Sequence, residues 1–155
     1  MSDFDAIWRD CGPTLWRAVY VYAGGRRDVA DDAVAEAFAR AMARGDAVRD
    51  PVPYLYRVAF RVAAAELKRM QTTTELLGTH EAPVTGDALT GPSPDLLRAL
   101  QRLSPAQRAA VYLHYQADLP VKEVARLTGT SSASVKVHLS RGRKRLAELL
   151  REAQG

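Results

Sequence analysis

The chain has 155 residues, 47% of them hydrophobic, and its single cysteine is Cys11. This length accommodates one ordinary domain or two small helical ones, and so apolar a composition argues against wholesale disorder. A lone cysteine excludes an internal disulfide framework. The N-terminus is acidic without an apolar run, and nothing approaches the roughly 18 apolar residues of a membrane span. We therefore expect a cytoplasmic protein without membrane insertion.

Positive charge is concentrated in the C-terminal part of the chain. Residues 96–155 hold 11 Lys/Arg against four Asp/Glu, whereas residues 71–95 hold four acids and no Lys or Arg. Residues 1–70 are nearly balanced, with 11 Lys/Arg against 10 Asp/Glu. A basic C-terminal part suits a phosphate-rich partner, although a merely solvated basic helix would give the same charge.

Two helices are expected at the start of the chain. The first carries Phe4 and Trp8 on a short apolar face and ends at Gly12–Pro13. Thr14 is the expected cap of the second helix, which stops at Gly24–Gly25. The Gly-Pro pair is read as a break because proline removes a helical donor.

Two longer helices follow. Asp28 is the expected N-cap of the third helix, and Gly45 is its expected end. Pro51 and Pro53 bound a loop before a fourth helix over residues 54–70. The apolar positions expected on the buried face of the third helix are Val34, Phe38, Ala41 and Met42.

Residues 71–95 are interpreted as a linker. Thr, Gly and Pro cluster there without a helical period, and its four acids are Glu75, Glu81, Asp87 and Asp95. The sequence therefore predicts an all-α fold. Its two small helical domains, 1–70 and 96–155, are joined by a flexible acidic linker.

Three helices are expected after the linker. Ser104 caps the first, with Pro105 at its first position, which is a favoured pairing. A short helix spans residues 120–127, and the last helix runs from the Ser131–Ser132 pair to about Leu150.

The spacing of residues 121–139 indicates a helix-turn-helix. Ala125 is small where two helices approach, Gly129 supplies a left-handed turn, and Val135 anchors the second helix. The N-terminal turns of such a helix can enter a major groove, and a helical hairpin without DNA affinity is the alternative. The residues expected to contact DNA from this helix are Ser132, Ser134, Lys136, Val137, Ser140, Arg141, Arg143 and Lys144.

A family resemblance extends over nearly the whole chain. The C-terminal promoter-binding domain of the extracytoplasmic-function sigma factors closely resembles LQRLSPAQRAAVYLHYQADLPVKEVARLTGTSSASVKVHLSRGRKRLAELL. Their N-terminal domain is similar to FDAIWRDCGPTLWRAVYVYAG, RDVADDAVAEAFARAMAR and VPYLYRVAFRVAAAELKRM. The resemblance implies an RNA polymerase sigma factor that directs promoter recognition, strand opening and transcription initiation. Core RNA polymerase and promoter DNA are its implied partners.

The resemblance implies that residues 28–44 dock on a coiled coil of the largest polymerase subunit. Asp32 and Glu36 are four residues apart on one face of this helix and could meet basic residues there. The alternative is a pair of solvated surface acids. Ala35 departs from the family, in which glutamine is common at this position.

The resemblance also implies a pocket for an unstacked base of the minus-ten element, around residues 45–53. Tyrosines can stack on splayed bases and basic side chains can hold phosphates, although the tyrosines could instead be core residues. Arg61, Ala65 and Glu66 depart from the family pattern, so its minus-ten preference is not carried over. The residues expected at this element are Tyr54, Tyr56, Arg57, Arg61, Lys68 and Arg69.

In the family, the linker passes through the polymerase channel, where acids can mimic nucleic acid; a plain tether is the alternative. Control by a separate anti-sigma factor is also implied by the resemblance.

No catalytic chemistry is evident in the sequence. Cys11 has no basic neighbour, the three histidines lack metal-ligand spacing, and no glycine-rich phosphate loop is present. We therefore expect no catalytic, cofactor or metal site and no enzyme. The alternative function is a helix-turn-helix regulator that binds duplex DNA without core polymerase, but residues 1–70 lack the strand pattern of its usual sensory half. The basic last helix argues against a third possibility, a protein-interaction module such as a sigma antagonist.

Overall fold

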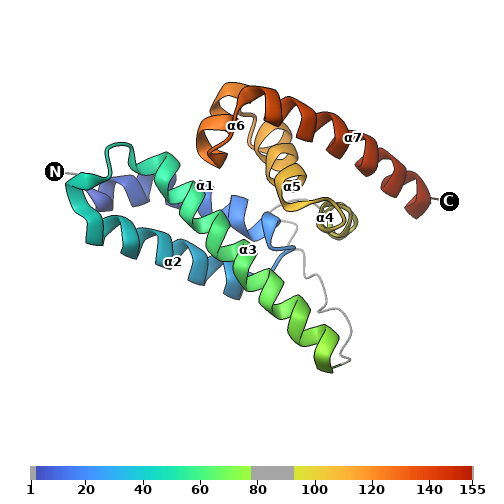
Figure 1. Cartoon of the computed structure of the whole chain (residues 1–155), viewed down its shortest axis with the longest axis horizontal. Helices are drawn as coiled ribbons and strands as arrows, with labels where there is room; N and C mark the ends of the chain where they lie inside the picture. Colours follow the sequence, from blue (N-terminus) through green and yellow to red (C-terminus); the bar gives the residue numbers. More distant parts are fainter. Residues whose placement is uncertain (1–2, 78–92, 155) are drawn as a thin grey trace.

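The structure is a computed structural model that describes residues 3–77 and 93–154, and within these ranges it contains helices and no strand (Figure 1). The expected all-α fold is confirmed. The N-terminal helices are α1 (Phe4–Tyr22), α2 (Arg27–Arg44) and α3 (Pro51–Leu77), with the 3₁₀ turn η1 (Gly45–Ala47) between the last two. The C-terminal helices are α4 (Pro94–Gln101), α5 (Pro105–Val111), the π-helical turn η2 (Tyr112–Gln116), α6 (Val121–Thr128) and α7 (Ser132–Gln154).

α1 is one helix, so the predicted break at Gly12–Pro13 is wrong. Its true cap is Asp3, whose side chain accepts hydrogen bonds from the first turn. A β-carbon on Gly12 would lie 2.7 Å from the ring of Trp8, so the glycine is the place where that ring packs. Pro13 removes one backbone hydrogen bond, but burial of Leu15 and the rest of the apolar face offsets that loss. α1 ends just before Gly24–Gly25, as predicted.

α2 begins at Arg27 and ends at Arg44, with Gly45 as its C-cap, so the predicted end is confirmed. Asp28 therefore lies in the first turn and is not the N-cap, which is Arg26. Met42 is 60% exposed, so its expected place in the core is wrong. α3 begins at Pro51 and not at residue 54, because proline is well tolerated in a first helical turn, where the missing N–H has no helical acceptor.

The expected linker is partly helical. α3 continues to Leu77, and the hydroxyls of Thr72 and Thr73 bond back to carbonyls four residues earlier, at 3.1 and 3.0 Å. A threonine whose hydroxyl bonds to a carbonyl of its own helix is accommodated within that helix. The cluster of threonines therefore did not mark the end of α3. Residues 78–92, with Glu81 and Asp87, lie outside the described part of the chain.

α4 is a helix that the sequence reading missed. Ser93 caps it by accepting a hydrogen bond from the Leu96 amide at 3.3 Å, and Pro94 occupies its first turn. The helix buries Leu97 and Leu100 completely or nearly so. It is only two turns long, so its apolar period is short and the neighbouring linker composition hides it.

Side chains of the C-terminal half cap the end of α1. Gln101 donates to the Val21 and Tyr22 carbonyls at 3.3 and 3.2 Å, and Arg108 donates to the Tyr22 carbonyl at 2.7 Å. Arg108 also donates to the carbonyls of Leu100 and Leu103. The last carbonyls of a helix have no partner within it, so these bonds supply the missing donors. The two halves therefore share one buried interface.

A second contact joins the halves near the start of α3. Arg126 of α6 pairs with Asp50, which precedes α3, at 2.5 Å, and with Glu123 at 2.6 Å. A β-carbon on Gly129 would lie 2.8 Å from Cδ of Arg57, so the Arg57 side chain lies against the turn after α6. The first part of α3 thus faces the helix-turn-helix.

Candidate nucleic-acid interface

α6 and α7 form the helix-turn-helix that the spacing predicted. Gly129 ends α6 with φ +70°, a left-handed conformation that only glycine adopts at little cost. Ala125 and Val135 are 6% and 1% exposed, so both occupy the core positions expected of them. Ser131, and not Ser132, caps α7: its hydroxyl accepts a hydrogen bond from the Ser134 amide at 3.1 Å.

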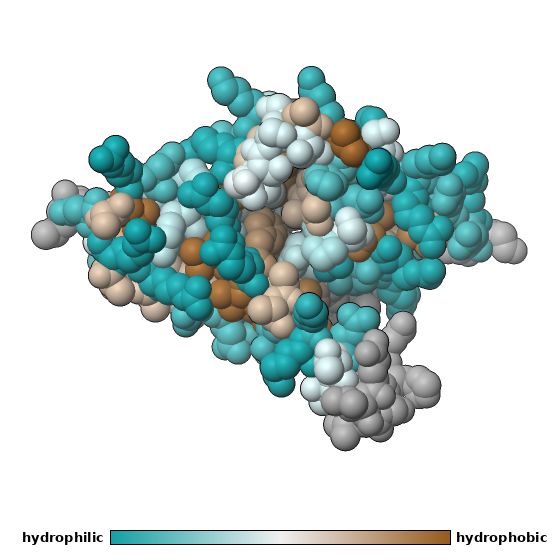
Figure 2. Space-filling model, in the orientation of Figure 1, coloured by the Kyte–Doolittle hydropathy of each residue, from teal (hydrophilic) through white to brown (hydrophobic). Residues whose placement is uncertain are grey.

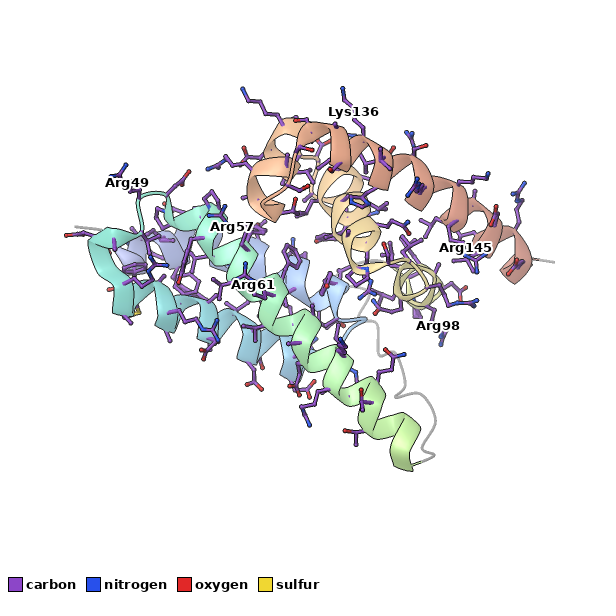
Figure 3. The ribbon with its side chains drawn as sticks, in the orientation of Figure 1. Arg49, Arg57, Arg61, Arg98, Lys136 and Arg145 are labelled. Atoms are coloured by element: carbon purple, nitrogen blue, oxygen red, sulfur yellow. The ribbon has the colours of Figure 1, made fainter. Side chains whose placement is uncertain are left out.

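The predicted DNA-contacting residues of α7 are mostly on its outer surface. Lys136 points away from the rest of the molecule (Figure 3). Val137 is 44% exposed, so its side chain is accessible to solvent. Ser134 is half-buried, and its hydroxyl accepts from that of Ser131 at 3.0 Å, so it belongs to the cap. The other exposed members of the set are Ser132, Ser140, Arg141, Arg143 and Lys144.

The C-terminal part of α7 is covered mainly by hydrophilic residues (Figure 2). Arg143 donates a hydrogen bond of 2.8 Å to the hydroxyl of Tyr115 in η2. Tyr115 was not among the residues that the sequence predicted for this interface. No spacing in the sequence predicted that Tyr115 lies beside α7, because the π-helical turn alters the helical period.

Two tyrosines expected at the minus-ten element lie in different surroundings. Tyr54 is half-buried beneath Arg44, whose guanidinium carbon is 5.6 Å from the ring centroid. Tyr56 is 4% exposed, and burial raises its pKa to about 12. In this arrangement Tyr56 is a core residue, the alternative that the sequence left open.

The expected basic residues of α3 are exposed along one helix. Figure 3 shows Arg57 and Arg61 on α3, with Arg57 on the side of α6. Lys68 and Arg69 lie further along, and Arg69 pairs with Glu66 at 2.5 Å. That pairing lowers the pKa of the Glu66 carboxyl through its hydrogen bond and places a carboxylate among the cations. The net positive charge of this end of α3 is therefore lower than its basic residues alone would give.

The acids expected to contact polymerase lie on the exposed side of α2. Asp32 and Glu36 are both exposed, and Glu36 pairs with Arg40 at 2.7 Å. An open cavity of about 360 Å³ lies between α1 and α2, and neither of these two acids lines it. Its lining includes the apolar side chains of Trp8, Trp16, Val34, Phe38 and Met42.

Residues 3–77 and 93–154 contain no group of three or more His, Cys, Asp or Glu side chains arranged to hold a metal ion. Within the same ranges, no helix is long and apolar enough to cross a membrane.

Comparisons with known proteins show what this helix-turn-helix is similar to. Residues 94–146, which span α4 to most of α7, match the family model described as Sigma-70, region 4. The fold matches the sigma factor RpoE of Bartonella quintana, solved in complex with the anti-sigma factor NepR, with a TM-score of 0.77. That match covers 97% of this chain and 98% of the other at 24% identity, so it shows a shared fold.

Two curated relatives match nearly the full chain. The ECF RNA polymerase sigma factor BldN of Streptomyces coelicolor is 30% identical over 159 residues, covering 95% of this chain and 60% of the relative. The ECF RNA polymerase sigma factor SigJ of Mycobacterium tuberculosis is 32% identical over 160 residues, covering 93% and 49%. This chain thus spans about half to three fifths of the relatives' length. Over this length the chain is similar to extracytoplasmic-function sigma factors, the family that its sequence resembles.

Proposed function

We propose that the chain is an RNA polymerase sigma factor that directs promoter recognition, DNA strand opening and transcription initiation. One observation carries the proposal: the segment matching sigma-70 region 4 folds as a helix-turn-helix whose second helix exposes Lys136, Arg141 and Lys144. The polymerase would supply the chemistry of RNA synthesis, so the chain itself acts as a non-enzymatic specificity subunit in the cytoplasm.

The two halves have different proposed roles. Residues 96–155 would read the minus-thirty-five element through α7, since an exposed basic helix of this kind suits a major groove. Residues 1–70 would bind core polymerase through Asp32 and Glu36 on α2, because exposed acids complement a basic partner. The proposed contacts with the minus-ten element are Tyr54, Arg57, Arg61, Lys68 and Arg69.

Two further expectations remain proposals. The acidic linker would run between the halves through the polymerase channel. Residues 71–77 and 94–95 of this segment belong to α3 and α4. A separate anti-sigma factor would control the chain, and the structure of RpoE with NepR supports this proposal through its similar fold.

Reconstituted transcription tests the proposed function. The purified chain is added to bacterial core polymerase with genomic promoter fragments, and transcript start sites are mapped. We expect initiation at defined sites only when the chain is present. Duplex binding without any core-dependent initiation would instead indicate a regulator of the helix-turn-helix type.

A further inference from the structure

The Tyr115 hydroxyl and the Arg143 guanidinium form a pair at the surface. Nη1 of Arg143 donates a hydrogen bond of 2.8 Å to the hydroxyl oxygen of Tyr115, and the two residues are 28 positions apart in the sequence. Tyr115 is 46% exposed, so the pair is open to solvent. A hydroxyl that accepts this bond keeps its own proton, and arginine keeps its other N–H donors. The pair therefore offers several donors to an anionic ligand.

A π-helical turn places Tyr115. The Ala117 amide donates to the Tyr112 carbonyl five residues back, at 3.1 Å, which adds one residue to the helical turn. His114 supports the turn, with Nδ1 2.8 Å from the Leu119 carbonyl oxygen and its ring edge-on to Tyr115 at 4.8 Å between centroids. An added residue changes the direction in which side chains leave a helix, and such turns recur at functional sites.

Arg143 lies on the flank of α7 that also carries Lys136 and Ser140. These three residues are spaced i, i+4 and i+7, which places them in one row along a helix, and all three are exposed. Tyr115 stands beside the last member of the row. The hydroxyl thus meets α7 on a side that the proposed function directs to DNA.

We propose that Tyr115 is a positioning residue for DNA binding: its hydroxyl holds the Arg143 guanidinium in the orientation that contacts a backbone phosphate. This inference rests on the proposed function. A long arginine side chain loses conformational freedom when it binds, and orienting it in advance lowers that cost. Because phosphate contacts carry no sequence information, the effect should be equal on all duplexes.

Tyr115→Phe in the full chain removes the hydroxyl and leaves the ring. Affinity is measured by fluorescence anisotropy on two duplexes, the minus-thirty-five region of a promoter mapped in the transcription experiment and a scrambled version. We expect affinity to fall about three- to tenfold on both duplexes, the effect of freeing one rotamer-rich side chain. In an Arg143→Ala background, Tyr115→Phe should have no further effect.

Lys144→Ala supplies the matched control, because Lys144 is an exposed cation next to Arg143 in the sequence. Its loss should combine additively with that of Tyr115→Phe. Thermal unfolding midpoints should be the same for the parent and Tyr115→Phe, which excludes a merely structural role.

An undiminished affinity of Tyr115→Phe would overturn the inference, and so would an equal loss in the Arg143→Ala background. A parent chain that binds neither duplex in a salt-dependent manner contradicts the proposed function itself, and the inference with it.

Discussion

Arg108 is a charged side chain in the protein interior, with 7% of its surface exposed. Its donors reach three carbonyl oxygens, and its guanidinium carbon lies 4.9 Å from the Tyr22 ring centroid. Burial lowers the pKa of the guanidinium, since desolvation penalises the cation, and the nearby Tyr22 opposes the shift. Arginine starts from so high a pKa that it stays charged at neutral pH. Arg108 is therefore a buried cationic cap.

Replacement of Arg108 tests the strength of this cap. Arg108→Met keeps an unbranched side chain but leaves the carbonyls of Tyr22, Leu100 and Leu103 with fewer donors. We expect the free energy of unfolding to fall by about 2–5 kcal/mol, the range for a broken buried polar network. Urea denaturation measures the change. Arg102→Met, on an exposed residue of the same segment, should change stability by less than about 0.5 kcal/mol.

Tyr56 links stability to alkaline pH. Burial, followed by the nearby Cys11, Tyr112 and Glu123, raises its pKa to about 12. The unfolded value is about 10, so the neutral phenol stabilises the fold below pH 10 and this stabilisation is lost as pH rises toward 12. The stabilisation that Tyr56 loses should reach at most about 2–3 kcal/mol. The free energy of unfolding, measured between pH 8 and about 11, should therefore fall less for Tyr56→Phe than for the parent.

At the scale of single elements, α2 presents acids to solvent where the proposed polymerase contact lies. Asp32→Arg combined with Glu36→Arg reverses the charge of this face and should abolish co-purification with core polymerase. Helical content should be unchanged, because both side chains are exposed. The control combines Asp10→Arg with Glu152→Arg, which makes the same change in net charge at other exposed positions. If both double variants co-purify equally, the assignment of this face is wrong.

Variants in α7 should distinguish a side chain that contacts a base from one that contacts a phosphate. Lys136→Ala is expected to cost about 1–3 kcal/mol on the cognate minus-thirty-five duplex, and less on unrelated DNA, if its ammonium reads a guanine. Lys144→Ala should weaken binding to every sequence and reduce the salt slope by about one. Titrations of both duplexes at several salt concentrations decide between these behaviours. Equal losses on the two duplexes would assign Lys136 to the phosphates.

Helix ends were predictable where one residue type determines the backbone. Gly45 and Gly129 ended their helices, and Ser104 with Pro105 began one, because these effects are local. The predicted helix break at Pro13 was wrong because packing on both sides of the proline outweighs the loss of one backbone hydrogen bond. The spacing predicted an exposed basic face on α7, but it did not predict that Tyr115 lies beside this helix, since its position depends on a π-helical turn and on a partner 28 residues away.

At the scale of the whole molecule, the two halves meet through contacts of unequal strength. The pair Asp50–Arg126 is exposed, with 62% and 43% of the side chains accessible, so solvent screens it. A double-mutant cycle with Asp50→Ala and Arg126→Ala should give a coupling below about 1 kcal/mol that declines with added salt. A coupling as large as the loss in Arg108→Met would contradict the view that the buried cap dominates.

The cap on α1 also bears on how fast the chain folds. Helical proteins usually fold quickly because most of their contacts join residues close in sequence. Here the bonds that complete the end of α1 join residues 79, 80 and 86 positions apart. The entropy of closing so long a loop must be lost before those bonds can form. We therefore expect folding to include a long-range step, in which the C-terminal half supplies the donors that complete the last turn of α1.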